Sequence, residues 1–224
     1  MFDIADFPKL ESPFIRKTIN EKYIVTFEIN PKYKWIFNRN IVLASEKIDG
    51  TNVSIIINKG KIIDIYNRKN KIEILANKKY FRFIDGINYA LYKELFRTNK
   101  SMQIFGELIG PTVNGNPYNE VRNIWVPFSY LKEKCEFKFW NKFLEEEIDG
   151  KDLSEKEIFE KTSNIFKNLW SLYYRRKTGE KIFAEGIVFY NKETGEMCKL
   201  RRDMFDWYEG ISHDFFKAKA KKDL

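Results

Sequence analysis

The 224-residue sequence has little cysteine, no long apolar run and few glycines or prolines. Its two cysteines, Cys135 and Cys198, are too few for a disulfide framework or a cysteine-ligated zinc site. No stretch approaches the roughly 20 apolar residues of a membrane span, and Asp3, Asp6 and Glu11 disrupt any secretory signal pattern. Because 43% of the residues are hydrophobic, disordered and fibrous classes are excluded. We therefore expect a globular, cytoplasmic protein.

The sequence has an excess of positive charge: 40 basic and 32 acidic residues give a net charge of +8. Clustered Lys and Arg suit a polyanionic partner such as nucleic acid, whereas Lys-rich solvated faces are also common. Four lysines lie between Lys217 and Lys222, in a tail that either holds phosphates or is simply solvated. The single histidine, His213, is expected at the surface.

Hydrophobic periodicity predicts an α+β fold with mainly antiparallel sheets flanked by helices. Strands are expected over residues 41–47, 52–58, 61–68, 101–108, 124–131, 184–190 and 196–201. Helices are expected over 78–99, from 152 and from 203. Asn58-Lys59-Gly60 should turn a hairpin, and Ser154 and Glu157 have the spacing of a capping box. Residues 1–40 are expected only to flank or cover the sheet.

A lysine stands where one apolar strand should end, in the stretch Glu46-Lys47-Ile48-Asp49-Gly50. A lysine is a nucleophile only when its amine is deprotonated, and its ordinary pKa is about 10.4. Burial or nearby positive charge must therefore lower that pKa. The glycine permits a tight turn that would aim the amine into a cleft. These few residues also fit a surface lysine before a hairpin, so the stretch alone does not decide.

Four further segments follow in a fixed order along the chain. QIFGELIG carries Glu107 at the end of a strand, and IWVPFSY carries Phe128. In AEGIVFY, Glu185 precedes a glycine and then an apolar strand. In CKLRRD, Lys199 and Arg201 alternate with Leu200, which places the two basic side chains on one face of a strand.

Together the five segments resemble the motifs of the covalent nucleotidyltransferases, which comprise ATP-dependent RNA and DNA ligases and mRNA capping enzymes. Lys47-Ile48-Asp49-Gly50 is similar to motif I, Phe105-Gly106-Glu107 to motif III, Trp125 to Ser129 to motif IIIa, Glu185-Gly186 to motif IV and Lys199-Leu200-Arg201 to motif V. The RNA ligase 2-like group is the most similar, through Glu46, Thr51-Asn52 and the run from Glu107 to Pro111 that continues to Asn116-Pro117-Tyr118.

The resemblance implies an ATP-grasp-like ligase nucleotidyltransferase (adenylyltransferase) domain over residues 1–224. It implies that Lys47 takes AMP from ATP, that the AMP passes to a 5′-phosphate, and that a 3′-hydroxyl then displaces it and seals the strand. ATP and Mg²⁺ or Mn²⁺ are the implied cofactors. The implied partners are RNA ends or a nicked RNA duplex, with DNA-containing ends and a separate end-binding partner left open.

Roles for single residues follow from the resemblance. Besides Lys47, it implies that Glu185 serves the metal, and that Lys199 and Arg201 neutralise phosphates while Lys199 lowers the pKa of Lys47. Nucleotide contacts are implied for Glu46, Asp49, Gly50, Asn52, Arg68, Glu107 and Phe128, with Lys199 among them. Glu107 would accept hydrogen bonds from the ribose hydroxyls, and Phe128 would stack on adenine. Plain alternatives are a solvated Arg68 and a Phe128 that only fills the core, and Trp125 is expected in the core.

Two features depart from the family pattern. Motif V usually has two lysines, whereas the second position here is Arg201, which keeps the charge but offers a planar, bidentate donor. Few residues follow Arg201, so we expect residues 202–224 to be a short basic helical tail without an OB-fold or another full domain. The alternatives are a DNA ligase, a capping-type nucleotidyltransferase, or a nucleic-acid-binding relative without catalysis. Replacing Lys47 by Ala separates an enzyme from a binding protein.

Overall fold

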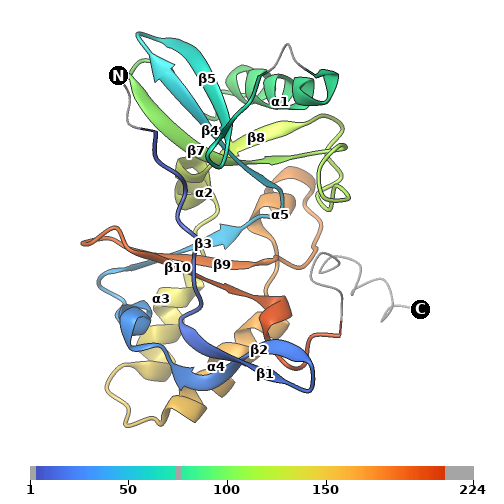
Figure 1. Cartoon of the computed structure of the whole chain (residues 1–224). Coiled ribbons are helices and arrows are strands. Elements are labelled where there is room, and N and C mark those ends of the chain that lie inside the picture. Colours follow the sequence, from blue (N-terminus) through green and yellow to red (C-terminus); the bar gives the residue numbers. More distant parts are fainter. Residues whose placement is uncertain (1–3, 74–76, 210–224) are drawn as a thin grey trace. The chain divides into compact units, whose positions relative to one another are not determined.

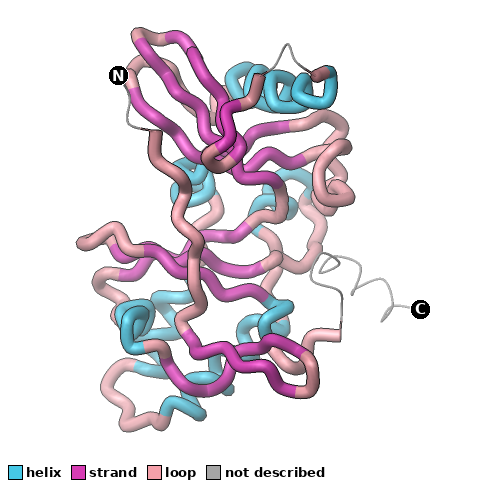
Figure 2. The backbone as a smooth tube through the Cα atoms, viewed as in Figure 1, coloured by secondary structure: helices cyan, strands magenta, loops and turns pink. Residues whose placement is uncertain are grey.

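The computed structural model of the chain describes residues 4–73 and 77–209. It contains two compact units, each built from separate stretches of sequence. Unit 1 combines the described part of 1–9 with Asp49–Glu133, and unit 2 combines Leu10–Ile48 with the described part of 134–224. In both units antiparallel sheet is flanked by helices (Figures 1 and 2), so the predicted α+β class is confirmed.

Unit 1 is built on a five-stranded antiparallel sheet with the strand order β6-β5-β4-β7-β8. Its strands are β4 (Thr51–Asn58), β5 (Lys61–Asn67), β6 (Asn70–Lys71), β7 (Met102–Ile109) and β8 (Ile124–Pro127). Its helical segments are η3 (Lys78–Tyr80), α1 (Phe81–Tyr92) and α2 (Phe128–Lys134), of which α1 packs against β8. The predicted hairpin of β4 and β5 is confirmed, and Ile55 and Ile57 at its centre are fully buried.

Two predicted boundaries in unit 1 were wrong. The helix expected to reach residue 99 ends at Tyr92, because Glu94 has a φ of 55°, which a continuing α-helix does not allow. The strand expected to reach residue 131 ends at Pro127, and Phe128 begins α2 instead. Proline has no amide hydrogen to donate to a sheet ladder, which explains why the strand ends there.

Unit 2 contains the hairpin of β1 (Phe14–Ile19) and β2 (Lys22–Ile29) and a three-stranded antiparallel sheet with the order β10-β9-β3. The strands of that sheet are β3 (Val42–Lys47), β9 (Gly186–Asn191) and β10 (Met197–Arg201). Its helical segments are η1 (Pro31–Phe37), α3 (Phe139–Phe143), η4 (Leu144–Ile148), α4 (Glu155–Lys167), α5 (Leu172–Thr178) and η5 (Arg202–Met204).

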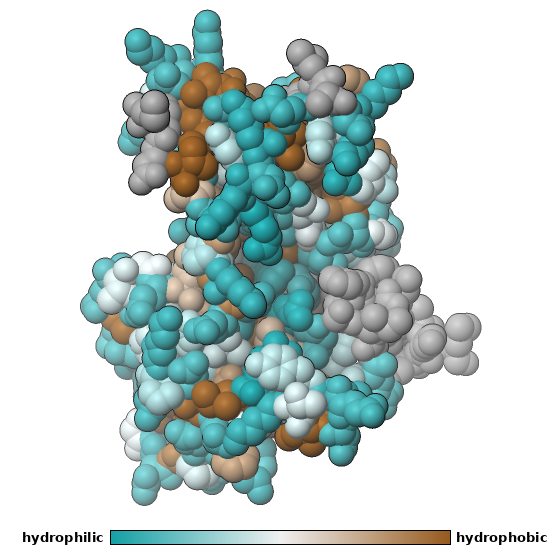
Figure 3. Space-filling model, in the orientation of Figure 1, coloured by the Kyte–Doolittle hydropathy of each residue, from teal (hydrophilic) through white to brown (hydrophobic). Residues whose placement is uncertain are grey.

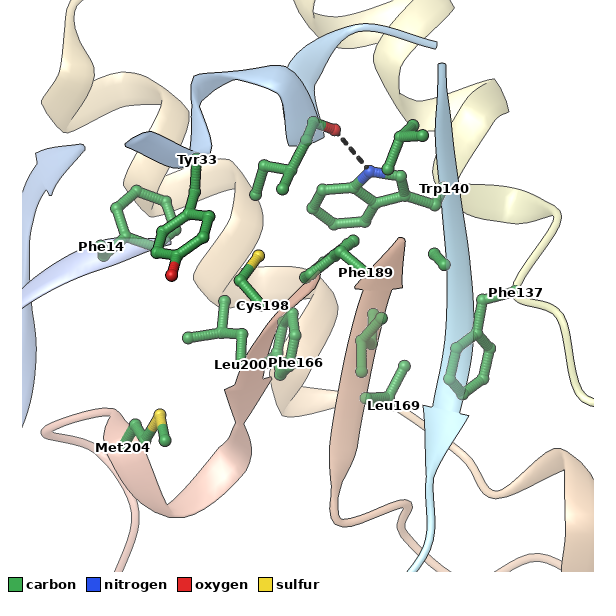
Figure 4. Packing of buried hydrophobic residues seen from close by; sticks show 14 of the residues in the cluster. Phe14, Tyr33, Phe137, Trp140, Phe166, Leu169, Phe189, Cys198, Leu200 and Met204 are labelled. Carbon is green, nitrogen blue, oxygen red and sulfur yellow. Dashed lines mark hydrogen bonds between the residues drawn. The ribbon is translucent and has the colours of Figure 1, made fainter. Parts of the chain in front are cut away.

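The hydrophobic core of unit 2 packs one face of this sheet against the helices and the β1–β2 hairpin (Figure 4). Trp140 is fully buried in this core, with its ring centroid 4.8 Å from that of Phe189, and its indole nitrogen donates a 3.1 Å hydrogen bond to the carbonyl of Ile36. Cys198 is fully buried in the same core, in agreement with its interpretation as a packing residue. Residues 1–40, for which the sequence suggested only a covering role, thus contribute a hairpin and a helical turn.

The helical region after residue 152 divides in two. The capping box of Ser154 and Glu157 is present and begins α4, as predicted. The apolar stripe expected to continue through Leu172 is interrupted, because α4 ends at Lys167 and Ser171 caps a new helix, α5. Of the predicted basic tail, the turn η5 is described, whereas His213 and the lysines from Lys217 to Lys222 lie outside the described residues.

The face drawn in Figure 3 is mainly hydrophilic, with separate smaller hydrophobic areas. Large apolar side chains such as Tyr23, Phe27 and Ile63 are at least partly exposed. Among the residues that the structure describes, no helix combines the length and apolar character needed to cross a membrane.

Candidate active site

Strand register in unit 2 brings together residues that are far apart in sequence. Gly186, the first residue of β9, pairs with Lys47 of β3 on one side and with Arg201 of β10 on the other. Glu185 directly precedes this glycine. A Cβ atom on Gly186 would lie 2.2 Å from the carbonyl oxygen of Leu200, so only glycine allows the three strands to meet this closely. The motifs predicted around Lys47, Glu185 and Arg201 therefore converge at one end of the sheet.

The carboxylate of Glu185 lies between two cations. The Nζ of Lys47 is 2.6 Å from its Oε2, and the Nη1 of Arg201 is 3.5 Å from its Oε1. Only 5% of the Glu185 side chain and 20% of the Lys47 side chain are exposed. At this degree of burial both charges need partners, because desolvation of a lone ion is costly. The pairing holds the Lys47 amine in a defined position.

Lys199 lies on the same face of β10 as Arg201, as the alternation predicted, while Cys198 and Leu200 face the core. Burial together with the positive charges of Lys47 and Arg201 lowers the pKa of Lys199 to about 8. The positive charge of Lys47 thus acts on Lys199; the expected effect in the other direction, of Lys199 on the pKa of Lys47, stays a prediction.

Asp203 belongs to this group, although the sequence analysis assigned it no role. Its Oδ2 lies 2.9 Å from the Nη2 of Arg201, and its side chain is 7% exposed. Burial raises the pKa of the Asp203 carboxyl, and the Arg201 guanidinium opposes that rise. Its other oxygen, Oδ1, is buried and has no hydrogen-bond partner among the described residues. One guanidinium therefore joins two carboxylates, Glu185 and Asp203, which a lysine ammonium in the place of Arg201 would not span in the same way.

Arg16 of β1 is a second residue that the sequence did not reveal. Its pKa is lowered by burial, and it interacts electrostatically with Arg201 and Asp203. Its guanidinium also lies 4.0 Å from the ring centroid of Tyr23. No local pattern around Arg16 signals this position, because it depends on where the β1–β2 hairpin packs. The position of Asp203 two residues after Arg201 was the only available signal for that carboxylate.

The balance of charge in this group is positive. Its basic members are Arg16, Lys47, Lys199 and Arg201, and its acidic members are Glu185 and Asp203. Such an excess of partly buried cations suits a polyphosphate. Magnesium commonly binds through one or two carboxylates together with substrate phosphates and water. Glu185 and Asp203 fit that donor set, whereas no group of three or more His, Cys, Asp or Glu within the described part of the chain could hold a metal on its own.

Glu46 points away from this group, because neighbouring residues of a strand face opposite sides. Its side chain is 1% exposed and accepts hydrogen bonds from the Oγ of Ser171 at 2.5 Å and the backbone nitrogen of Tyr173 at 2.7 Å. Burial raises the pKa of Glu46 to about 7. Both carboxylate oxygens are used to bind the first turn of α5, so these contacts do not support the predicted nucleotide contact of its side chain.

In unit 1, Asn52 and Glu107 lie directly opposite each other on β4 and β7. The Oδ1 of Asn52 is buried without a hydrogen-bond partner among the described residues. Because Val53 pairs with Asn67, the exposed Arg68 follows β5 at the same end of the sheet. The structure thus brings these three predicted contacts to one edge of unit 1.

Asp49 and Gly50 are held by the loop that follows β7. The Nδ2 of Asn114 donates to the Oδ1 of Asp49 at 3.0 Å and to the carbonyl of Gly50 at 2.8 Å. The hydroxyl of Tyr118 accepts a 2.8 Å hydrogen bond from the backbone nitrogen of Asp49. The described contacts of these residues fix the turn after β3.

Phe128 is partly exposed at the start of α2, and its ring centroid lies 4.7 Å from that of Phe7 in a tilted arrangement. It therefore packs against the N-terminal segment of unit 1. Trp125 is fully buried and donates to the carbonyl of Val53 at 3.1 Å, which confirms it as a core residue.

A family model described as RNA ligase matches residues 40–205, which is most of the chain. Curated proteins gave no significant match. Among solved structures, an apo mutant of Naegleria gruberi RNA ligase is similar with a TM-score of 0.45 and 14% identity, over 89% of this chain and 58% of that one. The same ligase with pyrophosphate gives a TM-score of 0.42 and 14% identity, over 99% and 61%. A mutant with AMP and Mn gives 0.41 and 13%, over 88% and 58%. The chain thus spans less than two thirds of the length of these ligases.

Proposed function

Because the chain belongs to the RNA ligase family, we propose that it is an ATP-dependent RNA ligase that joins 5′-phosphate and 3′-hydroxyl ends through lysyl-AMP. The observation that carries the proposal is the group of Lys47, Glu185, Lys199 and Arg201, which the pairing of β3, β9 and β10 brings together. The excess of cations beside the carboxylates of Glu185 and Asp203 supports ATP and a divalent metal as the cofactors. We further propose that units 1 and 2 act as one nucleotidyltransferase domain.

In the first step the amine of Lys47 attacks the α-phosphorus of ATP. An N–P bond forms, the bond to the bridging oxygen breaks, and pyrophosphate leaves as the amine gives up its proton. The ion pair with Glu185 holds the amine of Lys47 in place before the reaction. Attack therefore requires that Lys47 leaves this pair and loses a proton, which the adjacent positive charge of Lys199 favours.

In the second step a 5′-phosphate oxygen takes AMP from Lys47, which restores the amine. A 3′-hydroxyl then attacks the activated phosphate and AMP leaves. Lys199 and Arg201 bind the phosphates whose charge is redistributed in each transfer. Glu185, with Asp203 beside it, would hold a divalent metal, and a metal ion there polarises phosphate oxygens when it is bound. Asp203 orients Arg201 by its ion pair.

In unit 1 we propose that Glu107 and Asn52 bind the nucleoside, that Arg68 contacts a phosphate and that Phe128 stacks on adenine. The pairing of Asn52 with Glu107 supports the first assignment. Adenine that stacks on Phe128 would lie near Phe7, whose ring contacts that of Phe128. Asp49 and Gly50 serve by fixing the turn that follows Lys47. The side chain of Glu46 serves by anchoring α5.

Intact mass after incubation with ATP and Mg²⁺, and separately with GTP or NAD, tests the first step. We expect a gain that matches one AMP with ATP only, and no gain for Lys47→Ala. The matched control is Lys192→Ala, an exposed lysine next to β9 that should accept AMP normally. A GMP adduct would assign the protein to the capping type, and no adduct from folded protein would refute the proposal. Sealing of a 5′-phosphorylated nicked RNA duplex, compared with DNA, then tests the substrate.

A further inference from the structure

One basic surface of unit 2 has no role in the chemistry proposed above. It consists of Arg175, Arg176 and Lys177 in the last turn of α5 together with Lys181 just beyond it, and we refer to it as the α5 surface. All four side chains are exposed. The only acidic residue in this stretch is Glu180, whose carboxylate accepts a 3.2 Å hydrogen bond from the hydroxyl of Tyr174. The stretch therefore holds four basic residues and one acidic residue.

Contacts before and after α5 fix the backbone of this segment, which gives the surface a defined shape. The backbone nitrogen of Ser171 donates to the carbonyl of Ile182 at 2.9 Å, and the rings of Trp170 and Phe183 stack with centroids 4.3 Å apart. Gly179 ends the helix in the left-handed conformation, with its nitrogen 2.8 Å from the carbonyl of Arg175. A preformed surface loses less conformational entropy when it binds a ligand.

The α5 surface is also fixed relative to the strand that carries the nucleophile. Glu46, which directly precedes Lys47, holds the Oγ of Ser171 and the backbone nitrogen of Tyr173. Arg175, where the basic turn begins, follows Ser171 by four residues, which corresponds to about 6 Å along the helix axis at a rise of about 1.5 Å per residue. The charge of Arg176 also acts on Cys135, whose carbonyl accepts a hydrogen bond from the nitrogen of Glu46. All these residues belong to unit 2.

Some other basic residues of unit 2 have acidic partners. Lys161 pairs with Glu147 at 2.5 Å, and Arg39 pairs with Glu145 at 2.6 Å. Arg175 and Arg176, in contrast, form no ion pair with any described residue. Their charge is thus available to an external polyanion, and guanidinium groups bind phosphate with paired hydrogen bonds.

We propose that the α5 surface binds the sugar–phosphate backbone of the RNA strand whose end is brought to Lys47. The inference rests on the proposed ligase function and adds the part of the protein that holds the polynucleotide. Contacts of this kind are independent of base sequence and weaken as salt is raised.

The double variant R175Q/R176Q tests this surface, with K156Q/K167Q on exposed positions of α4 as a control that removes equal charge. Binding of a 5′-phosphorylated single-stranded RNA is measured by fluorescence anisotropy over a range of salt. We expect R175Q/R176Q to bind about tenfold or more weakly near 0.1 M salt, and its slope of log K against log salt to be smaller by about 1.4. The control should resemble the wild type.

Self-adenylation with ATP, measured on the same samples, reports folding and the nucleotide site separately. R175Q/R176Q that forms AMP-protein normally but binds RNA as tightly as the wild type would overturn the α5 proposal and leave the ligase proposal intact. An equal loss in K156Q/K167Q would also overturn it, because the effect would then be one of net charge. A wild type that binds RNA but never becomes adenylated would refute the ligase function. The comparison of RNA binding between R175Q/R176Q and the control would still show whether the α5 surface binds RNA.

Discussion

The buried carboxyl of Glu46 makes the stability of this protein depend on pH in a defined direction. Glu46 is 1% exposed, and burial raises its pKa from 4.5 to about 7 in spite of its hydrogen bonds to α5. A folded-state pKa above the unfolded one means that the folded protein binds the proton more tightly. The stability from this group is therefore complete below pH 4.5 and is lost as pH rises through about 7.

The size of the effect follows from the shift. A rise from 4.5 to about 7 corresponds to about 3 kcal/mol, at about 1.4 kcal/mol for each unit. We expect the free energy of unfolding of the wild type to fall by about this amount, relative to Glu46→Gln, between the two ends of that pH range. The amide of Gln cannot ionise and can still accept a hydrogen bond from Ser171 or Tyr173, so its contribution should not change with pH.

Urea unfolding followed by tryptophan fluorescence, from about pH 5 to about pH 8, measures this difference. Glu193→Gln, at an exposed position in the turn after β9, is the matched control and should follow the wild type. Glu46→Ala should be less stable at every pH, because the Ser171 hydroxyl and the Tyr173 amide lose their acceptor at about 1–3 kcal/mol each. Parallel curves for the wild type and Glu46→Gln across the whole range would refute the reasoning.

Three further predictions concern the group around Lys47 and the core beside it. Asp203→Asn should slow lysyl-AMP formation roughly 10- to 100-fold, because Arg201 loses a charge-assisted partner worth about 1.5–3 kcal/mol; a single-turnover rate within about twofold of wild type would contradict this. Gly186→Ala should lower both stability and self-adenylation, since its Cβ would lie 2.2 Å from a backbone oxygen. Gly195→Ala has open space but a φ of 74°, so it should lower stability and leave the adenylation of folded protein unchanged. Burial raises the pKa of Cys135 to about 12 and that of the second cysteine as well, so neither thiol should react with a thiol reagent at about pH 8 until urea unfolds the protein.

Local patterns in the sequence were sufficient for much of the fold. The turn at Asn58-Lys59-Gly60 and the alternation around it predicted the β4–β5 hairpin, and the capping box predicted where α4 begins. The errors fell at ends of elements. Pro127 and the cap at Ser171 were local signals that apolar periodicity obscured, since the apolar residues on either side of them continue the same spacing.

Residue order along the chain also indicated the members of the site. Lys47, Glu185, Lys199 and Arg201 were recognisable because their motifs follow one another in a fixed order that resembles the nucleotidyltransferases. Each of them also places a charge next to apolar strand residues. Such a placement is visible without a structure. It does not say which charges meet.

The sequence by itself determined the α+β class, the strands and the charged residues at their ends, because these depend on periods of a few residues. Only the tertiary structure decided that Lys47 lies 2.6 Å from a carboxylate 138 residues away, since that distance depends on the register between β3 and β9. It likewise decided that Asp203 and Arg16 join the group and that Glu46 faces α5 instead. Strand register and the packing of separate elements arise from contacts between distant residues, and no window along the chain contains them.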